Sequence, residues 1–320
     1  MQHFTEQFVI CFNAVVPFFI IMFIGWFAGK IKMVGPQFFV GINKMVFFVF
    51  FPATLFRNLY NADLAAVFHP GLVGYFMIGT LIIYILSWLI GARFLEKRKL
   101  AVFVQAGHRS NYLVLAAAVV VVLLGEEAMP QATLMMPIVV AFYTILAAIV
   151  FIVTGQSEDI SGLQRLKGVV IGTLKVPIII ATFVSLLANL SNLYVPEVMD
   201  RSLASLSAMA APAALIGVGG TLSMEKVRRN FRLSIASAAM KNVIVPIVFI
   251  TPAVFLGFRG VELAIIAMLG LSPIATATYN IAVEMGGDGD AAASCLVLSN
   301  ALALLTIVPG LTILRALELF

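Results

Sequence analysis

The sequence predicts an all-α polytopic membrane protein, with ten transmembrane helices arranged as two inverted repeats of five. Three observations predict this fold class: an apolar composition, long apolar stretches along the whole chain, and helix-breaking residues at matching positions in both halves. Hydrophobic residues make up 62% of the 320 residues and charged residues 11%, against about 45–50% and about 25% in soluble domains. A water-soluble fold of this length could not bury the excess. The composition therefore excludes a soluble enzyme and a nucleic-acid-binding module, and it makes the lipid bilayer the expected surroundings.

Ten stretches are long and apolar enough to cross a bilayer as helices, which takes about 20 residues each. They are residues 8–28, 38–58, 70–91, 101–124, 130–154, 168–190, 198–222, 232–256, 261–285 and 290–315. The stretches are about twice as long as the strands of a membrane barrel and do not alternate in polarity, so helices are expected. The first stretch has no basic segment before it and no small-residue cleavage site, which favours a retained span over a signal peptide.

Basic residues in the connections predict the orientation, because cytoplasmic loops are enriched in Lys and Arg. The loops after odd-numbered spans carry 12 of them: Lys30, Lys32, Arg93, Lys97, Arg98, Lys99, Arg165, Lys167, Lys226, Arg228, Arg229 and Arg232. The loops after even-numbered spans carry 3: Arg57, Arg201 and Arg259. The odd loops are therefore expected in the cytoplasm and both termini outside.

Matching landmarks in the two halves indicate an internal repeat. The pairs are Pro17 and Pro177, Pro52 and Pro212, and Leu55 and Leu215, each 160 residues apart, and Asn111 and Pro273, and Gly125 and Gly287, each 162 apart. Each half holds five spans, an odd number, so two copies must insert with opposite orientation, as in many secondary transporters. We expect a first repeat over residues 1–154, a cytoplasmic linker over 155–167 and a second repeat over 168–320.

Span 9 contains the clearest break. Pro273 lacks an N–H and clashes with the preceding helical turn, and Ala275, Thr276, Thr278 and Asn280 follow it. Small and hydroxyl residues allow close helix approach and supply donors where the backbone is interrupted. The alternative is an ordinary proline kink, whose freed groups the neighbouring helices satisfy.

Span 4 carries five polar side chains besides Tyr112 within the eight residues from Gln105 to Tyr112. Among them, Arg109 is the most informative, because an intramembrane arginine costs about 2.5–3.5 kcal/mol on insertion scales. It lies roughly 13 Å from the expected cytoplasmic end of the span, at 1.5 Å per residue, which is deep for snorkelling to the surface. Arg109 should therefore face a cavity or a partner.

If spans 4 and 9 meet at their breaks, two half-helix N-termini lie at mid-membrane, where their partial positive charges favour an anion. Arg109 adds a guanidinium group, which holds a carboxylate in two-point fashion. The predicted substrate is therefore a small organic anion. The residues expected to shape its pocket are Ser110, Asn111, Tyr112, Pro273, Ala275, Thr276, Thr278 and Asn280.

Four further residues are candidates for coupling or gating: His108, Lys241, Asn43 and Glu284. His108 could carry a proton, because imidazole titrates near neutral pH, although a lone histidine is more often only hydrogen-bonded. Lys241 could pair with the substrate or with Glu284, or hydrogen-bond carbonyls freed at a break. Glu284 could also be solvated at the end of span 9, and Asn43 could face the interior. No cofactor or metal is expected, and the coupling ion, sodium or a proton, stays open.

The residues also resemble the auxin efflux carrier family, of the bile acid/sodium symporter-like superfamily. The resemblance lies in residues 17–30 and 43–56, where PATLF at Pro52 to Phe56 resembles the family's PALLF, in Arg109 to Asn111, in Pro212 to Gly219 with Lys241 and Pro246, and in Ser272 to Ala292. It implies a scaffold bundle, a transport bundle with crossed spans 4 and 9, elevator-like movement and a homodimer. It also implies that Asn111 and Pro273 lie at the substrate site. Family members usually carry Gly and Pro after the span-4 Asn, whereas residues 114–118 here read VLAAA.

The short central linker is similar to that of prokaryotic members, whose substrates include malonate and malate. The sequence therefore predicts a secondary transporter of a small carboxylate in the bacterial inner (plasma) membrane, with both termini periplasmic. A passive anion channel and a transporter-like sensor are the alternatives. An enzyme is not expected, because catalysis needs a metal set or a nucleophile with its base, and His108 alone is available within the spans.

Overall fold

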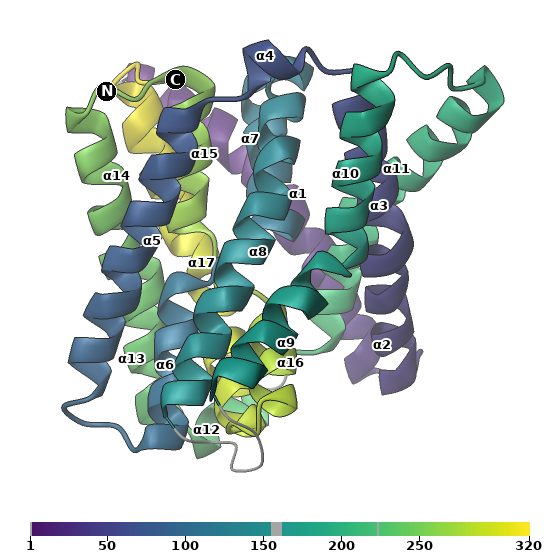
Figure 1. The fold of residues 1–320 in the computed structure, drawn as a ribbon. Coiled ribbons are helices and arrows are strands. Elements are labelled where there is room, and N and C mark those ends of the chain that lie inside the picture. Colours follow the sequence, from purple (N-terminus) through teal and green to yellow (C-terminus); the bar gives the residue numbers. More distant parts are fainter. Residues whose placement is uncertain (1, 155–161, 223) are drawn as a thin grey trace.

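The computed structural model describes residues 2–154, 162–222 and 224–320, and these contain helices and no β-strand (Figure 1). The first half comprises α1 (Gln2–Lys30), α2 (Pro36–Met45), η1 (Val46–Phe50), α3 (Phe51–Tyr60), α4 (Leu64–Val67), α5 (Pro70–Gly91), α6 (Lys97–His108), η2 (Tyr112–Ala116), α7 (Ala117–Leu124), η3 (Glu126–Ala128) and α8 (Met129–Val153). The second half comprises α9 (Gly162–Leu174), α10 (Pro177–Leu190), α11 (Glu197–Gly220), α12 (Met224–Arg229), α13 (Phe231–Ala239), η4 (Met240–Ile244), α14 (Val245–Phe255), α15 (Gly260–Leu271), α16 (Ala277–Glu284) and α17 (Gly289–Ala316). The segments η1, η2 and η4 are π-helical turns, and η3 is a 3-10 turn.

Seven helical stretches in the described residues are long and apolar enough to cross a membrane, which confirms a polytopic membrane protein. They are Gln2–Lys30, Pro36–Tyr60, Pro70–Gly91, Glu126–Val153, Glu197–Gly220, Phe231–Phe255 and Gly289–Ala316. In predicted spans 4, 6 and 9 the structure has shorter apolar helices, Tyr112–Leu124, Pro177–Leu190 and Gly260–Leu271. The count of ten spans and the inverted repeat stay predictions.

The predicted span 168–190 is not one continuous helix. α9 ends at Leu174 and α10 begins at Pro177, with Val176 extended between them at φ −65° and ψ 129°. A proline has no N–H and disfavours the helical conformation of the residue before it, which explains the break. α9 also begins inside the predicted linker 155–167, of which residues 155–161 lie outside the described part.

The helices form two groups that lie side by side (Figure 1). In the first, which we call the α11 bundle, α1 packs against α11, and α3 packs against α10 and α11. In the second, the α17 bundle, α5 packs against α6, α13 against α17, α14 and α7 against α15, and α8 against α6 and α7. Contacts of α3 with α8 and of α1 with α17 join the two bundles.

Glycines let α1 and α11 approach closely. A methyl group on Gly219 would collide with the Met22 carbonyl, and one on Gly25 would collide with the Ile216 carbonyl. Small residues of this kind allow the tight van der Waals packing that joins helices within a membrane. Both chain ends lie on one face of the molecule, together with α4, and α12 lies on the opposite face (Figure 1). That the face with the termini is the outer one stays a prediction.

Candidate functional site

Two interrupted helices meet inside the protein. α6 ends at His108 and η2 begins at Tyr112, whereas α15 ends at Leu271 and α16 begins at Ala277. We call the intervening residues, 109–111 and 272–276, the junction. The Asn111 N–H donates to the Pro273 carbonyl at 2.8 Å, and the Ala275 N–H donates to the Arg109 carbonyl at 3.3 Å. The two segments run antiparallel, with Ser110 opposite Ile274.

The two interruptions have different local causes. In the second, Pro273 cannot donate to the preceding turn, and Ser272 before it is extended at ψ 141°, as expected for a residue that precedes proline. The first contains neither Pro nor Gly, and Arg109 is extended at φ −95° and ψ 101°. Its backbone groups bond to the second segment instead of continuing α6. Tertiary pairing therefore supports an interruption that local sequence does not impose.

Arg109 is a buried cation with no counter-charge in an ion pair with it among the described residues. Its exposed fraction is 5%, and its Nε and Nη1 have no hydrogen-bond partner among the described residues. Ion pairs in the described part include Arg57–Asp200, His69–Glu262 and Arg201–Glu197, which join partly or fully exposed side chains and do not involve Arg109. The guanidinium group thus presents unused donors beside the junction.

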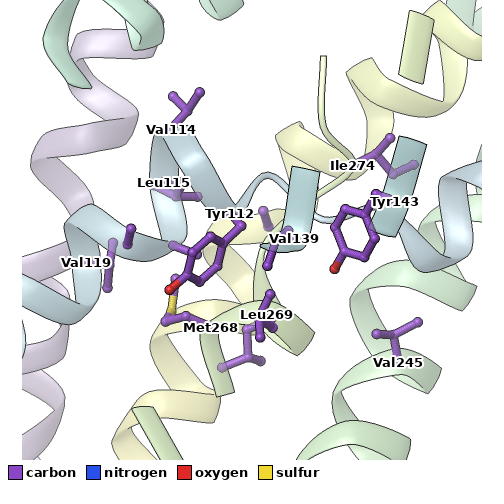
Figure 2. Close-up of a cluster of buried hydrophobic side chains, with 14 of the residues drawn as sticks. Tyr112, Val114, Leu115, Val119, Val139, Tyr143, Val245, Met268, Leu269 and Ile274 are labelled. Atoms are coloured by element: carbon purple, nitrogen blue, oxygen red, sulfur yellow. The ribbon is translucent and has the colours of Figure 1, made fainter. Parts of the chain in front are cut away.

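Hydroxyl and ring groups surround the start of the junction. The hydroxyl groups of Ser110 and Tyr143 share a hydrogen bond of 2.9 Å. The His108 Nδ1 donates to the Val104 carbonyl at 2.7 Å, and its ring lies edge-on to those of Tyr84 and Tyr143, with centroids 5.3 and 5.7 Å away. Tyr143 lies in a buried cluster with Ile274 and Leu269 (Figure 2). This packing fixes Ser110 and His108 on either side of Arg109.

α17 and η4 support the second segment. The Ile274 N–H donates to Ser299 Oγ at 3.2 Å, and the Asn300 side chain donates to the Ile274 carbonyl at 3.1 Å. Ser299 Oγ donates in turn to Asn242 Oδ1 at 2.7 Å, and the Asn242 amide returns a bond of 2.9 Å to the Ser299 carbonyl. Both backbone groups of Ile274 therefore have side-chain partners.

A cavity of about 670 Å³ lies between the two bundles, among α3, α11, α7 and α8. Its polar lining includes Thr54, Arg57, Asn58 and Thr133. The Asn58 amide donates to Thr133 Oγ1 at 3.0 Å and so links one bundle to the other. The junction residues do not line this cavity, but η2 and α7, which follow the first interruption, do.

A family comparison connects this arrangement to a known class of proteins. The family described as membrane transport protein matches residues 10–309, nearly the whole chain. The chain belongs to this family. It is therefore a membrane transporter, in agreement with the expectation that it is not an enzyme, and the match supports the resemblance to auxin efflux carriers. Among curated proteins, none matches the chain.

The transporter buries most of the residues that the sequence singled out near the breaks. Tyr112 is fully buried, and its hydroxyl donates to the Ala132 carbonyl at 2.9 Å, so it bonds to α8. Thr278 is fully buried and its Oγ1 has no partner in the described part. Thr276 is half-buried, whereas Asn280 is exposed, so the structure does not bring Asn280 into the junction.

The candidates for coupling or gating lie in different places. Lys241 is 1% exposed, and its Nζ donates to the Leu269 carbonyl, in the last turn of α15, at 3.3 Å. Asn43 lies on α2 in the α11 bundle, against Gly217, and not at the junction. Glu284 is the last residue of α16, and its side chain lies outside the described part. His108 and Glu284 thus end interrupted helices, and Lys241 contacts a third helix end, that of α15, from outside.

Sequence reasoning missed the support residues Tyr143, Asn242, Ser299 and Asn300. A signal existed for three of them. Ser299 and Asn300 form an adjacent polar pair inside an apolar span, and Asn242 directly follows Lys241. Tyr143 gave no such signal, because aromatic residues are common throughout this chain.

Proposed function

We propose that this transporter is a secondary carrier of a small organic anion, a mono- or dicarboxylate such as malonate or malate, which binds at the junction. The observation that carries the proposal is the buried Arg109 guanidinium with two nitrogens that have no partner among the described residues. Removing such a charge from water costs several kcal/mol, and the cost is offset when a second charge pairs with it. A carboxylate fits, because it accepts two parallel N–H bonds from one guanidinium.

The proposed mechanism is alternating access by elevator-type movement of the α17 bundle against the α11 bundle. This mechanism requires that the chain consists of two inverted five-helix repeats whose spans 4 and 9 cross at the junction. Two features support it: the interrupted helices belong to the α17 bundle, and the 670 Å³ cavity lies between the two bundles. Such a movement would break the bond between Asn58 and Thr133. We also propose that the transporter is a homodimer in a bacterial inner membrane, which rests on the family resemblance. That both termini are periplasmic rests on the basic residues in the loops.

The test is thermal stabilisation of the purified transporter by a panel of mono- and dicarboxylates, with and without sodium, at two pH values. A ligand that binds the native state raises its stability by about 2.7 kcal/mol at a concentration 100 times its Kd. We expect a selective shift with malonate or malate. The dependence of this shift on sodium or pH would identify the coupling ion.

Arg109→Ala tests the site itself. It should weaken carboxylate affinity by about 10²–10⁴-fold, because two charge-assisted hydrogen bonds of about 1.5–3 kcal/mol each are lost. Without ligand, the variant should melt at the same temperature as the wild type or higher, since an unpaired buried charge has been removed. The matched control is Arg201→Ala, which removes an exposed arginine paired with Glu197 at 2.6 Å and should bind as the wild type does.

Two results would contradict the proposal. A folded Arg109→Ala variant with unchanged carboxylate affinity would show that Arg109 does not hold the anion. A folded wild type that no carboxylate stabilises, and that aromatic acids such as indole-acetate also leave unchanged, would favour the channel or sensor alternatives. Flux into liposomes then separates these two, because a channel conducts without saturation and a sensor does not transport.

A further inference from the structure

Pro273 leaves a backbone carbonyl without its helical partner. In an α-helix each carbonyl accepts from the N–H four residues later, and for Leu269 that residue is Pro273, which has no N–H. The carbonyl lies in the last turn of α15, where the helix dipole places a partial negative charge. Leu269 is 1% exposed and Ser272 is fully buried. Water therefore does not satisfy this end of the helix, and another donor is needed.

Lys241 supplies that donor from a neighbouring helix. Its Nζ lies 3.3 Å from the Leu269 carbonyl oxygen, and its exposed fraction is 1%. The residue lies in the π-helical turn η4, in which the Val245 N–H reaches back five residues to the Met240 carbonyl. Pro246 follows and cannot donate to this turn, which accounts for its widened form.

The widened turn places two consecutive residues against different partners. Lys241 reaches α15 and Asn242 reaches Ser299 on α17. No carboxylate in the described part lies within ion-pair distance of Lys241. Among the described residues, the ammonium group is therefore compensated by the carbonyl end of an interrupted helix and not by an acidic side chain.

We propose that Lys241 is a tethered cation that takes the place of a sodium ion at the carbonyl end of α15. In transporters with interrupted helices, freed carbonyls and half-helix C-termini are the groups that coordinate sodium. Here that end is already occupied by a covalently attached positive charge. Oxygen atoms that could complete a cation site lie on η4, on α17 and at the end of α15: Asn242 Oδ1, Ser299 Oγ and the buried Ser272 Oγ, which has no partner in the described part. The wild-type transporter consequently does not bind sodium at this position.

The experiment compares melting temperatures of purified wild type and Lys241→Ala in sodium chloride and in choline chloride at equal concentration. The wild type should melt at the same temperature in both salts. Lys241→Ala should be destabilised in choline, and increasing sodium should recover a few degrees, because the vacated site then binds the ion and mass action favours the folded state. Lys44→Ala removes an exposed lysine on α2, and this matched control should not respond to sodium.

Two outcomes would overturn the inference: equal melting of Lys241→Ala in the two salts, which would make Lys241 a structural cap only, and stabilisation of the wild type by sodium that is as large as that of Lys241→Ala. If Lys241→Ala does not fold, the melting temperatures of Lys241→Gln in the two salts test the inference instead, because glutamine keeps a hydrogen-bond donor but removes the charge. Failure of both variants to fold in either salt would also count against the proposal. No carboxylate is used, so this result is independent of the proposed substrate.

Discussion

The two interrupted segments of the junction differ in how their polar groups are satisfied. The segment 109–111 carries Arg109, two of whose nitrogens have no partner in the described part, and His108 next to it has a free Nε2. The segment 272–276 carries no charge and, although Ser272 Oγ has no partner in the described part, both backbone groups of Ile274 are bonded to α17. The difference indicates that the two segments have different roles. The second segment is held in place by hydrogen bonds to α17, whereas the first presents donors that have no partner in the described part. Variants in each segment should therefore affect different properties.

The largest effect is expected where the support is removed. Ser299→Ala deletes the hydroxyl that accepts from the Ile274 N–H and donates to Asn242 Oδ1. Each of the two buried groups left unpaired costs about 1–3 kcal/mol, so the free energy of unfolding should fall by about 2–6 kcal/mol. We expect a melting temperature several degrees below that of the wild type, opposite to the result expected for Arg109→Ala.

The control for this variant is Ser202→Ala, whose exposed hydroxyl donates to the Val198 carbonyl of its own helix. Its stability should change by less than about 0.5 kcal/mol. If Ser299→Ala had the same melting temperature as this control, α17 would not support the second segment. The proposed difference between the two segments would then be wrong.

A smaller effect is expected at the contact that orients the first segment. Tyr143→Phe removes the hydroxyl bonded to Ser110 Oγ at 2.9 Å, a bond of about 1 kcal/mol. Carboxylate affinity should fall about fivefold, as measured by thermal shift titration. Tyr75→Phe is the matched control, because it removes a 2.6 Å bond to the Phe249 carbonyl. Both variants should lose some stability, and equal affinity in the two would contradict a role for Tyr143 in binding.

Composition and segment length were sufficient to predict the membrane class, and Pro273 and the polar run at Gln105 to Tyr112 were sufficient to predict where helices end. These features are local. The bonds made by Ser299 and Asn300 are not, because they depend on how α17 is rotated about its axis and on which helix packs against it. The break before Pro177 does not follow from the repeat, because the matching Pro17 lies inside the continuous helix α1, whereas Pro177 begins α10.

The cavity between the bundles could not be predicted either. Its lining comes from α3, α7, α8 and α11, which are far apart in the sequence. The charge and apolarity of single segments carry no information about the gap that remains when two bundles pack. Arg109 was identified because an intramembrane charge is costly wherever it lies, and this property needs no knowledge of its neighbours.

The smallest effect is expected at Asn280, which the sequence assigned to the pocket and the structure leaves exposed. At about 3.6 residues per turn, Asn280 lies roughly 200° around α16 from the buried Thr278, so both cannot face the junction. Asn280→Ala should therefore change stability by less than about 0.5 kcal/mol and leave carboxylate affinity unchanged. Thr278→Val should alter affinity if α16 contributes to the site. A loss of affinity in Asn280→Ala alone would mean that α16 turns its other face to the substrate, and the second segment would then be part of the pocket as well as its support.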